Sequence, residues 1–399
     1  MGAPSIGPRT NLAVVAVALA AAVLIGTSVV RGVIEVPMLT GLVLAAALAL
    51  VVTPPAIYLS YRLGMLDHPD DRKFQKEPVP LLGGPGVLIA FGTALLVCLY
   101  GLSQHGGWSP AFYVVRTELL AMLAAGAFIV LIGVVDDRWG LKPGVRLIGQ
   151  LAAVSIVMRY GVVMSFLPRT DAGRTGEIVL TVIWLVGMTN AMNFLDGLDG
   201  LAAGLTAVAA LSFAVITAMT GQVAVTVASL CLAGATLGFL RHNIRPASIY
   251  LGDSGATLLG FTLACIAIIG DWGTGPTPTE NLFVPLIVLG IPIYDVIYIT
   301  VHRYRAGLIR SLGDWAAYVG HDHLHHRLLR LGMRPGPATL FICLGGAALG
   351  VLAVILQTKG ELDRYDKFLA LVLAIIFFVG VTVLMELGKN SGNHNNPPS

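Results

Sequence analysis

The sequence predicts an all-α integral membrane protein, a polytopic helix bundle of about 11–12 transmembrane helices. Of the 399 residues, 56% are hydrophobic and only 12% are charged, with a mean hydropathy of +0.82. A soluble globular protein carries about 25% charged residues. Apolar runs of roughly 20 residues, the length that crosses a bilayer, also recur along the whole chain. Their even spread favours one membrane bundle over several soluble domains.

Twelve apolar stretches are candidate spans. The first lacks the strongly basic leader of a signal peptide, with only Arg9 before it, so we expect a retained helix. Residues 1–36 are expected to form this extra helix and its link, 37–387 the main transmembrane domain, and 388–399 a disordered polar tail. The predicted spans are about 12–30, 37–59, 81–101, 113–135, 146–166, 176–194, 203–219, 223–240, 255–271, 281–301, 338–356 and 367–387.

The basic residues predict the orientation of the bundle. When both termini share one side with the loops after the second, fourth, sixth, eighth and tenth spans, that side holds 17 of the 25 lysines and arginines. An excess of basic residues marks the cytoplasmic side. The net charge of +3 is too small to favour nucleic acid as a partner. The four cysteines fall inside apolar runs without paired-ligand spacing, which argues against a disulfide framework or a cysteine-based zinc site.

Five polar clusters lie in the loops of that cytoplasmic side. Ordinary turn residues would be expected on both sides of the membrane, so this one-sidedness predicts cytoplasmic active-site loops at the membrane surface. The clusters are residues 67–76, 136–137, 190–199, 241–253 and 303–327.

The central cluster carries two carboxylates, Asp196 and Asp199, each followed by a glycine. On a helix this spacing would put both carboxylates on one face. Two close carboxylates repel, so a cation such as Mg²⁺ is the natural third party. The alternative is a polar turn between two membrane helices, bent at Gly197 and Gly200.

Two further acidic positions flank apolar runs. Asp136 and Asp137 end one run, where one carboxylate could bind a metal and the other accept a proton from a nucleophile. Simple helix termination is the alternative, although an acidic pair opposes the dipole at a helix C-terminus. Asp253 begins another run, where it either points at a cation or caps the helix.

Two loops supply groups suited to anions. Arg72, Lys73 and Lys76 of the first loop suit phosphate oxygens, with a loop that only sets topology as the alternative. Histidine-rich tracts often bind metals, but no Cys or Glu accompanies the fifth loop at zinc spacing. A nucleotide pyrophosphate or sugar hydroxyls are therefore the other candidate ligands. The tract comprises His321, His323, His325, His326 and Arg327.

In this order the motifs resemble the polyprenyl-phosphate N-acetylhexosamine-1-phosphate transferases, glycosyltransferase family 4. The resemblance covers about Asp67 to Arg327, and the departures include Gln75, where the family usually has His, and Ala256, where Ser is common. The matching motifs are Asp67-x-Pro69…Arg72-Lys73…Pro78-Val79-Pro80…Gly83-Gly84, Asp136-Asp137, Asn190-Ala191-Met192-Asn193-Phe194-x-Asp196-Gly197-x-Asp199-Gly200, Asn243…Pro246-Ala247…Gly252-Asp253-Ser254-Gly255 and His323-Leu324-His325-His326-Arg327.

The resemblance implies a multi-pass enzyme of the bacterial inner membrane. It would transfer an N-acetylhexosamine-1-phosphate from a UDP-sugar to undecaprenyl or another polyprenyl phosphate, release UMP and initiate cell-envelope glycan synthesis. The His-x-His-His form favours N-acetylglucosamine. Phospho-N-acetylmuramoyl-pentapeptide transferase, whose branch typically has three consecutive histidines, ranks second.

Two other classes are minor alternatives. A secondary transporter should place its carboxylates near mid-bilayer, within the spans. A CDP-alcohol phosphotransferase would require Ala-Arg after Asp199-Gly200, where this chain reads Leu201-Ala202.

The resemblance also implies roles. Asp253, Asp137 and Asp196 would bind Mg²⁺, with Mn²⁺ as an alternative. Asp136 would be the base for direct attack by the lipid phosphate, with an aspartyl-phosphate intermediate as the competing mechanism. A hydrophobic groove would take the isoprenoid tail, and a homodimer is an alternative to a monomer. The predicted catalytic residues are Asp136, Asp137, Asp196 and Asp199, and the predicted substrate-binding residues are Arg72, Lys73, Lys76, Asn190, Asn193, Asn243, His323, His325, His326 and Arg327.

Overall fold

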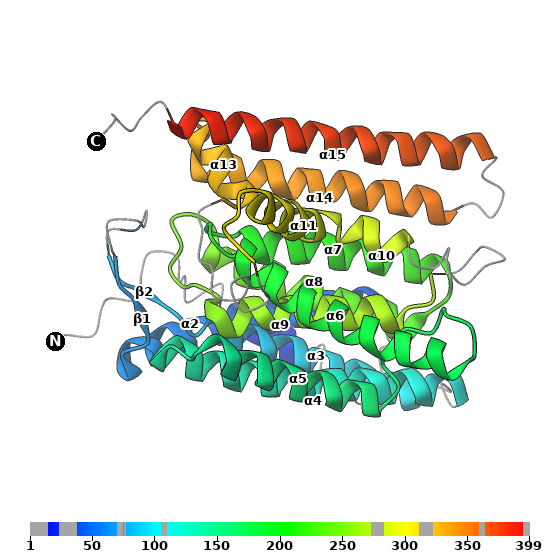
Figure 1. Ribbon diagram of the computed structural model, residues 1–399. Helices are drawn as coiled ribbons and strands as arrows, with labels where there is room; N and C mark the ends of the chain where they lie inside the picture. Colours follow the sequence, from blue (N-terminus) through cyan, green and yellow to red (C-terminus); the bar gives the residue numbers. More distant parts are fainter. Residues whose placement is uncertain are drawn as a thin grey trace.

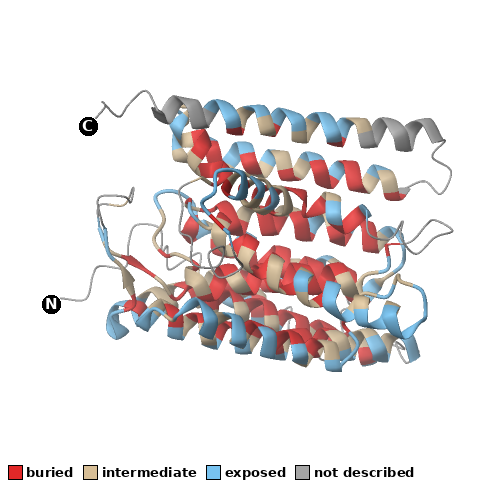
Figure 2. Ribbon diagram, in the orientation of Figure 1, coloured by how far each residue is buried: buried red, intermediate tan, exposed pale blue. Residues whose placement is uncertain are grey.

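A computed structural model of the chain describes residues 15–23, 38–69, 75, 77–104, 110–272, 283–310, 322–358 and 364–393. Long helices lie side by side in a bundle whose buried residues gather along its middle (Figures 1 and 2). The short strands β1 (Leu66–Asp67) and β2 (Val79–Pro80) pair antiparallel at one end. The helices are α2 (Met38–Leu63), α3 (Gly83–Gln104), α4 (Pro110–Trp139), α5 (Pro143–Arg159), α6 (Asp171–Leu195), α7 (Leu201–Met219), α8 (Val223–Asn243), α9 (Gly252–Ile269), α10 (Phe283–Val288), α11 (Gly290–Arg305), α13 (Leu324–Arg330), α14 (Pro335–Thr358) and α15 (Arg364–Asn393).

Eight of the described helices are long and apolar enough to cross a membrane. They are α2, α3, α4, α6, α7, α8, α9 and α14. Their number and arrangement confirm the predicted class, a polytopic helical membrane protein. The central helices α7, α8 and α9 are the most buried, because they pack against neighbours on all sides while the outer helices keep an exposed apolar face (Figure 2).

Several predicted spans take a different form. The span predicted at 146–166 is the 17-residue helix α5, and the span at 281–301 is divided at Leu289 into α10 and α11. Gly290 and Pro292 account for this break, since proline lacks an N–H and is best accommodated in the first turn of a new helix. In Figure 1, α11 is viewed close to its own axis while the long helices run across the view.

The structure describes part of each chain end. Residues 15–23 are helical and lie within the first predicted span, and the rest of that span lies outside the described residues. Helix α15 continues to Asn393, into the tail predicted at 388–399.

The polar clusters meet at one end of the bundle. Each of α2, α4, α6 and α8 ends there, and the next helix starts back from the same end. Helices α4 and α9 are in close contact at this end, since a Cβ on Gly133 would lie only 2.2 Å from the Cα of Ser254. Glycine is therefore required at this crossing, which brings Asp136 and Asp137 beside Asp253.

Candidate active site

The two adjacent aspartates of α4 face different partners. Asp136 is buried, its Oδ1 accepts the N–H of Leu141 at 2.7 Å, and its Oδ2 lies 3.2 Å from the Nη1 of Arg146. Asp137 instead reaches the first turn of α9, where its carboxylate accepts the N–H groups of Asp253 (2.7 Å) and Ser254 (3.2 Å). A carboxylate at a helix N-terminus is favoured by the helix dipole. Asp137 therefore holds α9 in place, while Asp136 keeps a cationic neighbour.

Asp253 lies between an amide and a cation. Its Oδ1 accepts a hydrogen bond from the Nδ2 of Asn193 at 2.8 Å, and its Oδ2 lies 3.5 Å from the Nη1 of Arg146. The alternative that Asp253 caps α9 is not observed, because Leu251 is the N-cap residue and Asp137 supplies the capping carboxylate. Arg146 thus lies between two carboxylates that come from α4 and α9.

A small cavity of about 20 Å³ opens between these groups. A space of 10–15 Å³ already holds one water molecule. The polar side chains that line this cavity are Asp136, Arg146, Gln150, Asn190, Asn193, Asp253 and Thr257. Carboxylate and amide oxygens are the donors that Mg²⁺ prefers, so the lining fits a small hard cation. Among the described residues, no group of three or more His, Cys, Asp or Glu side chains is placed to hold a metal by itself.

Asp196 and Asp199 lie on a turn and not on one face of a helix. Residues 196–200 connect α6 to α7, and Gly200 has a φ of +77°, which favours glycine. The helical arrangement considered for this pair is therefore wrong, and the polar-turn alternative describes the backbone. Burial raises the pKa of Asp196, and the nearby carboxylates of Asp253, Asp137 and Asp199 raise it further. This crowding of negative charge favours a bound cation or a proton.

Two other predicted residues hold the turn against the loop before α9. The Oδ2 of Asp199 accepts the N–H of Ala247 at 3.1 Å. Asn243 accepts the N–H of Gly200 through its Oδ1 (3.1 Å) and donates to the carbonyl of Ile249 (2.9 Å). Both side chains thus connect backbone segments, and their predicted contact with substrate stays a prediction.

The histidine tract packs against the central cluster. The ring centroid of His323 lies 5.4 Å from that of Phe194, and His325 stacks between His323 (6.0 Å) and His326 (4.1 Å). A Cβ on Gly197 would lie 2.2 Å from the Nε2 of His325. The glycine after Asp196 therefore leaves room for this imidazole.

Arg327 is almost fully buried and donates to the protein itself. Its Nε donates to the carbonyl of Asp322 and its Nη1 to the carbonyl of Met385, both at 2.7 Å. The guanidinium also lies over the ring of Tyr298, 5.1 Å from its centroid. Its predicted role in substrate binding stays a prediction, and its observed contacts connect α13 to α11 and α15.

The basic residues predicted in the first loop, Arg72, Lys73 and Lys76, lie outside the described residues. Gln75, which departs from the family pattern, donates to both the carbonyl and the Oδ2 of Asp67. Its Oε1 accepts the hydroxyl of Tyr250 at 2.5 Å. These bonds connect the first loop to the loop before α9, so all five predicted clusters meet at one site.

Comparison with known proteins agrees with this geometry. The family model described as Glycosyl transferase family 4 matches residues 119–271, which include both acidic clusters and the turn. A decaprenyl-phosphate N-acetylglucosaminephosphotransferase of Mycobacterium tuberculosis is 33% identical over 377 residues, which cover 88% of this chain and 90% of that protein. The chain belongs to glycosyl transferase family 4.

Two further relatives of this family 4 transferase cover most of its length. A probable undecaprenyl-phosphate N-acetylglucosaminyl 1-phosphate transferase of Bacillus subtilis is 28% identical over 85% of this chain and 88% of its own. An undecaprenyl-phosphate alpha-N-acetylglucosaminyl 1-phosphate transferase of Escherichia coli K12 is 27% identical over 79% and 83%. The predicted family, and with it the prediction of a membrane-bound phosphoglycosyl transferase, is confirmed.

Sequence reasoning missed three residues of this family 4 site. Arg146 was counted only as a topology signal, yet it bridges Asp136 and Asp253. Gln150, one turn further along α5, exchanges amide hydrogen bonds with Asn190 at 2.8 and 3.2 Å. Arg146 and Gln150 are four residues apart in the helix that begins at Pro143, so both lie on one face of that helix. The spacing alone does not show which helix this face meets. Asp295 lies inside an apolar run, and only its charge distinguished it.

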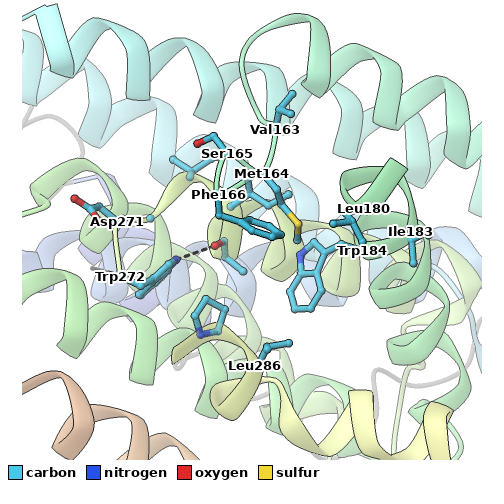
Figure 3. A pocket seen from close by; sticks show the side chains of 15 residues that line it. Val163, Met164, Ser165, Phe166, Leu180, Ile183, Trp184, Asp271, Trp272 and Leu286 are labelled. Carbon is cyan, nitrogen blue, oxygen red and sulfur yellow. Dashed lines mark hydrogen bonds between the residues drawn. The ribbon is translucent and has the colours of Figure 1, made fainter. Parts of the chain in front are cut away.

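A larger cavity of about 440 Å³ has none of the predicted site residues in its lining (Figure 3). It is lined by the loop after α5, the middle of α6, the end of α9 with the residues that follow it, and α10. Its lining is mostly apolar, with the two indole rings of Trp184 and Trp272 in its wall (Figure 3). Because α6 ends and α9 begins at the carboxylate site, this cavity lies toward the opposite end of the bundle.

Proposed function

We propose that this protein transfers N-acetylglucosamine-1-phosphate from UDP-N-acetylglucosamine to a polyprenyl phosphate and releases UMP, at the cytoplasmic face of a bacterial inner membrane. The observation that supports this most directly is the convergence of Asp136, Asp253, Asn193 and Arg146 on one small polar cavity. The names of the relatives support the sugar and the lipid. The excess of basic residues on the same side supports the cytoplasmic orientation.

Both substrates are anions, so the reaction requires neutralised charge and close positioning. Asp253, with Asp137 and Asp196 and together with oxygens of the substrate, would hold Mg²⁺, which supplies charge neutralisation to the pyrophosphate when bound. The substrate oxygens are needed because these side chains do not form a metal site by themselves. Asn193 fixes the carboxylate of Asp253 through its 2.8 Å hydrogen bond. The protein thereby sets the orientation of its acidic groups before substrate arrives.

Asp136 is the base in this proposal. The N–H of Leu141 fixes one carboxylate oxygen, and the other faces Arg146 and the cavity. This oxygen would accept the proton of the lipid phosphate, whose oxygen then attacks the phosphorus that carries the sugar. Arg146 stabilises the negative charge that Asp136 carries before the transfer.

The isoprenoid tail needs an apolar path between the helices. Trp184, which lines the 440 Å³ cavity, lies about 17 Å along α6 from its end at Leu195, at 1.5 Å per residue. A hydrocarbon chain that starts at the carboxylate site and follows α6 would reach this cavity. We therefore place the distal part of the tail there.

Purified protein in detergent, incubated with radiolabelled UDP-N-acetylglucosamine, undecaprenyl phosphate and Mg²⁺, tests the proposal. Metal-dependent appearance of label in the lipid fraction, with release of UMP and loss of transfer on chelation, is the expected result. Transfer only from UDP-N-acetylmuramoyl-pentapeptide would reassign the donor. Inactivity with every UDP-hexosamine would refute the proposed function.

A further inference from the structure

Asp295 is a buried carboxylate for which the proposed reaction has no use. It lies on α11 and has no exposed surface. Its Oδ2 is 2.7 Å from the Nδ1 of His323, and its Oδ1 accepts the N–H of Leu324 at 2.8 Å. A buried charge is costly unless it is paired and hydrogen-bonded. Both oxygens of Asp295 are thus committed to the first residues of the histidine tract.

We propose that Asp295 is a positioning residue that fixes the tautomer and orientation of His323, so that the Nε2 of His323 accepts a hydrogen bond from a hydroxyl group of the sugar-nucleotide donor. An ionised carboxylate only accepts hydrogen bonds, so the Nδ1 of His323 carries the proton. The other ring nitrogen, Nε2, is then a hydrogen-bond acceptor. The identity of the donor in this inference rests on the proposed function.

The position of His323 supports its contact with the donor. Its ring packs against Phe194, which directly follows Asn193, and Asn193 donates to Asp253. The Asp295–His323 pair therefore lies beside the residues that surround the small polar cavity. A change in the orientation of this ring should therefore affect substrate binding and not only the stability of the surrounding fold.

A second ion pair anchors the same segment without touching the histidine ring. Arg303, also on α11, donates from Nε and Nη2 to the two carboxylate oxygens of Asp322 at 2.8 and 2.5 Å. Helix α11 thus contributes Arg303, which pairs with Asp322, and Asp295, which pairs with the next residue, His323. The anchoring of the segment is therefore shared, whereas the tautomer of His323 depends on Asp295.

Asp295→Asn separates the anchoring of residues 322–324 from the control of the His323 tautomer. The asparagine Oδ1 can still accept the N–H of Leu324, but its amide donates to Nδ1 and so moves the ring proton to Nε2. We expect kcat/KM for UDP-N-acetylglucosamine to fall roughly 10- to 100-fold, as for other residues that orient a functional histidine, with the Tm of the purified protein close to wild type. Tyr294→Phe is the matched control, since it removes a 2.6 Å hydrogen bond to Thr382 from the adjacent position of α11. The control should change the rate less than about twofold.

A double-mutant cycle with His323→Asn tests whether Asp295 acts through the histidine. We expect Asp295→Asn to cause no further loss in the His323→Asn background. Additive losses, or wild-type turnover in Asp295→Asn alone, would overturn the inference. If Asp295→Asn fails to fold, the pair Asp295→Glu and Asp295→Gln makes the same comparison of carboxylate with amide, and equal activities at equal Tm would overturn it.

The wild-type assay separates this inference from the proposed function. Absence of transfer by the wild type from every UDP-hexosamine would refute the function. The inference is then judged on the affinity for UDP-N-acetylglucosamine, measured by isothermal titration calorimetry in the same variants. Equal and non-additive weakening by Asp295→Asn and His323→Asn supports it, and unchanged affinity in Asp295→Asn overturns it.

Discussion

Two charged regions lie at the same end of the bundle, and they differ in the exposure of their ion-paired side chains and in the length of their ion pairs. Around the small cavity, the side chains of Arg146 and Asp253 are 38% and 39% exposed, and their closest atoms are 3.5 Å apart. In the histidine region, Arg303 is 5% exposed, Asp295 has no exposed surface, and the pairs close at 2.5 to 2.8 Å. A partly exposed ion pair with a long separation can be replaced by a contact with a ligand. A short, buried ion pair instead fixes the positions of the segments that carry it. The first region is therefore suited to bind substrate and the second to position the groups that surround it.

Asp136→Asn should cause the largest loss of turnover of all the variants. A small loss would contradict the assignment of the first region to substrate binding and catalysis. The amide keeps the hydrogen bond from Leu141 but cannot take up a proton, so we expect turnover to fall about 10²- to 10⁴-fold, with normal folding. Transfer of label to lipid, measured beside the Tm of the purified variant, checks both parts. Asp171→Asn, an exposed acid in the first turn of α6 at the opposite end, is the control. Substantial activity in pure Asp136→Asn protein would rule out Asp136 as the base.

Arg327→Lys tests the second region. Its guanidinium is buried and donates to two backbone carbonyls, which a lysine cannot reach together with the contact to Tyr298. Hydrogen bonds from charged groups contribute about 1.5–3 kcal/mol each, so we expect the folded state to lose about 2–3 kcal/mol. Thermal unfolding followed by size-exclusion chromatography measures this loss. Arg330→Lys, an exposed position on the same helix α13, should have little effect.

The same variant also decides the sequence-based role of Arg327. If Arg327 anchors α13, the specific activity of the folded fraction should stay within a few-fold of wild type. Lost activity with an unchanged Tm would instead mean that Arg327 contacts substrate, as its place in the family motif suggested, and the contrast between the two regions would not hold.

Arg146→Gln should have an intermediate effect on rate and little on stability. An ion pair that is more than a third exposed contributes at most about 1 kcal/mol to folding. Removing the only described cation between Asp136 and Asp253 leaves their repulsion uncompensated, and we expect kcat/KM to fall about tenfold, which corresponds to 1.4 kcal/mol. Arg138→Gln, exposed in the last turn of α4, is the matched control. A loss of Tm without a loss of rate would make Arg146 a structural residue.

The sequence was sufficient for the class of fold and for the meeting of the polar loops at one end of the bundle, for identifiable physical reasons. Apolar runs must match the bilayer, so their length and number predicted a helical bundle, and charge asymmetry predicted that the polar loops share one side. The break between α10 and α11 was missed because Gly290 and Pro292 are themselves flanked by apolar residues on both sides. The partners Arg146, Gln150 and Asp295 were missed because each acts across helices, and spacing along one helix does not reveal which residue faces it from the next.

Gln75→His should have the smallest effect on rate. It tests the hydrogen bonds that link the first loop to Tyr250 at the edge of the first region. Gln75 both donates to Asp67 and accepts from Tyr250, and it stands where the family usually has histidine. A neutral imidazole also has one donor and one acceptor nitrogen, so it can keep one of the two hydrogen bonds to Asp67 and the one from Tyr250. We expect Gln75→His to change kcat/KM by less than about threefold. Gln75→Ala, which loses all three bonds at a partly buried position, should lose about 1–2 kcal/mol of local stability and more activity than Gln75→His. Steady-state rates with both substrates, measured together with Tm, distinguish the two variants. Equal losses in both would mean that the bridge between the first loop and Tyr250 depends on the glutamine itself and not on its pairing of one donor with one acceptor.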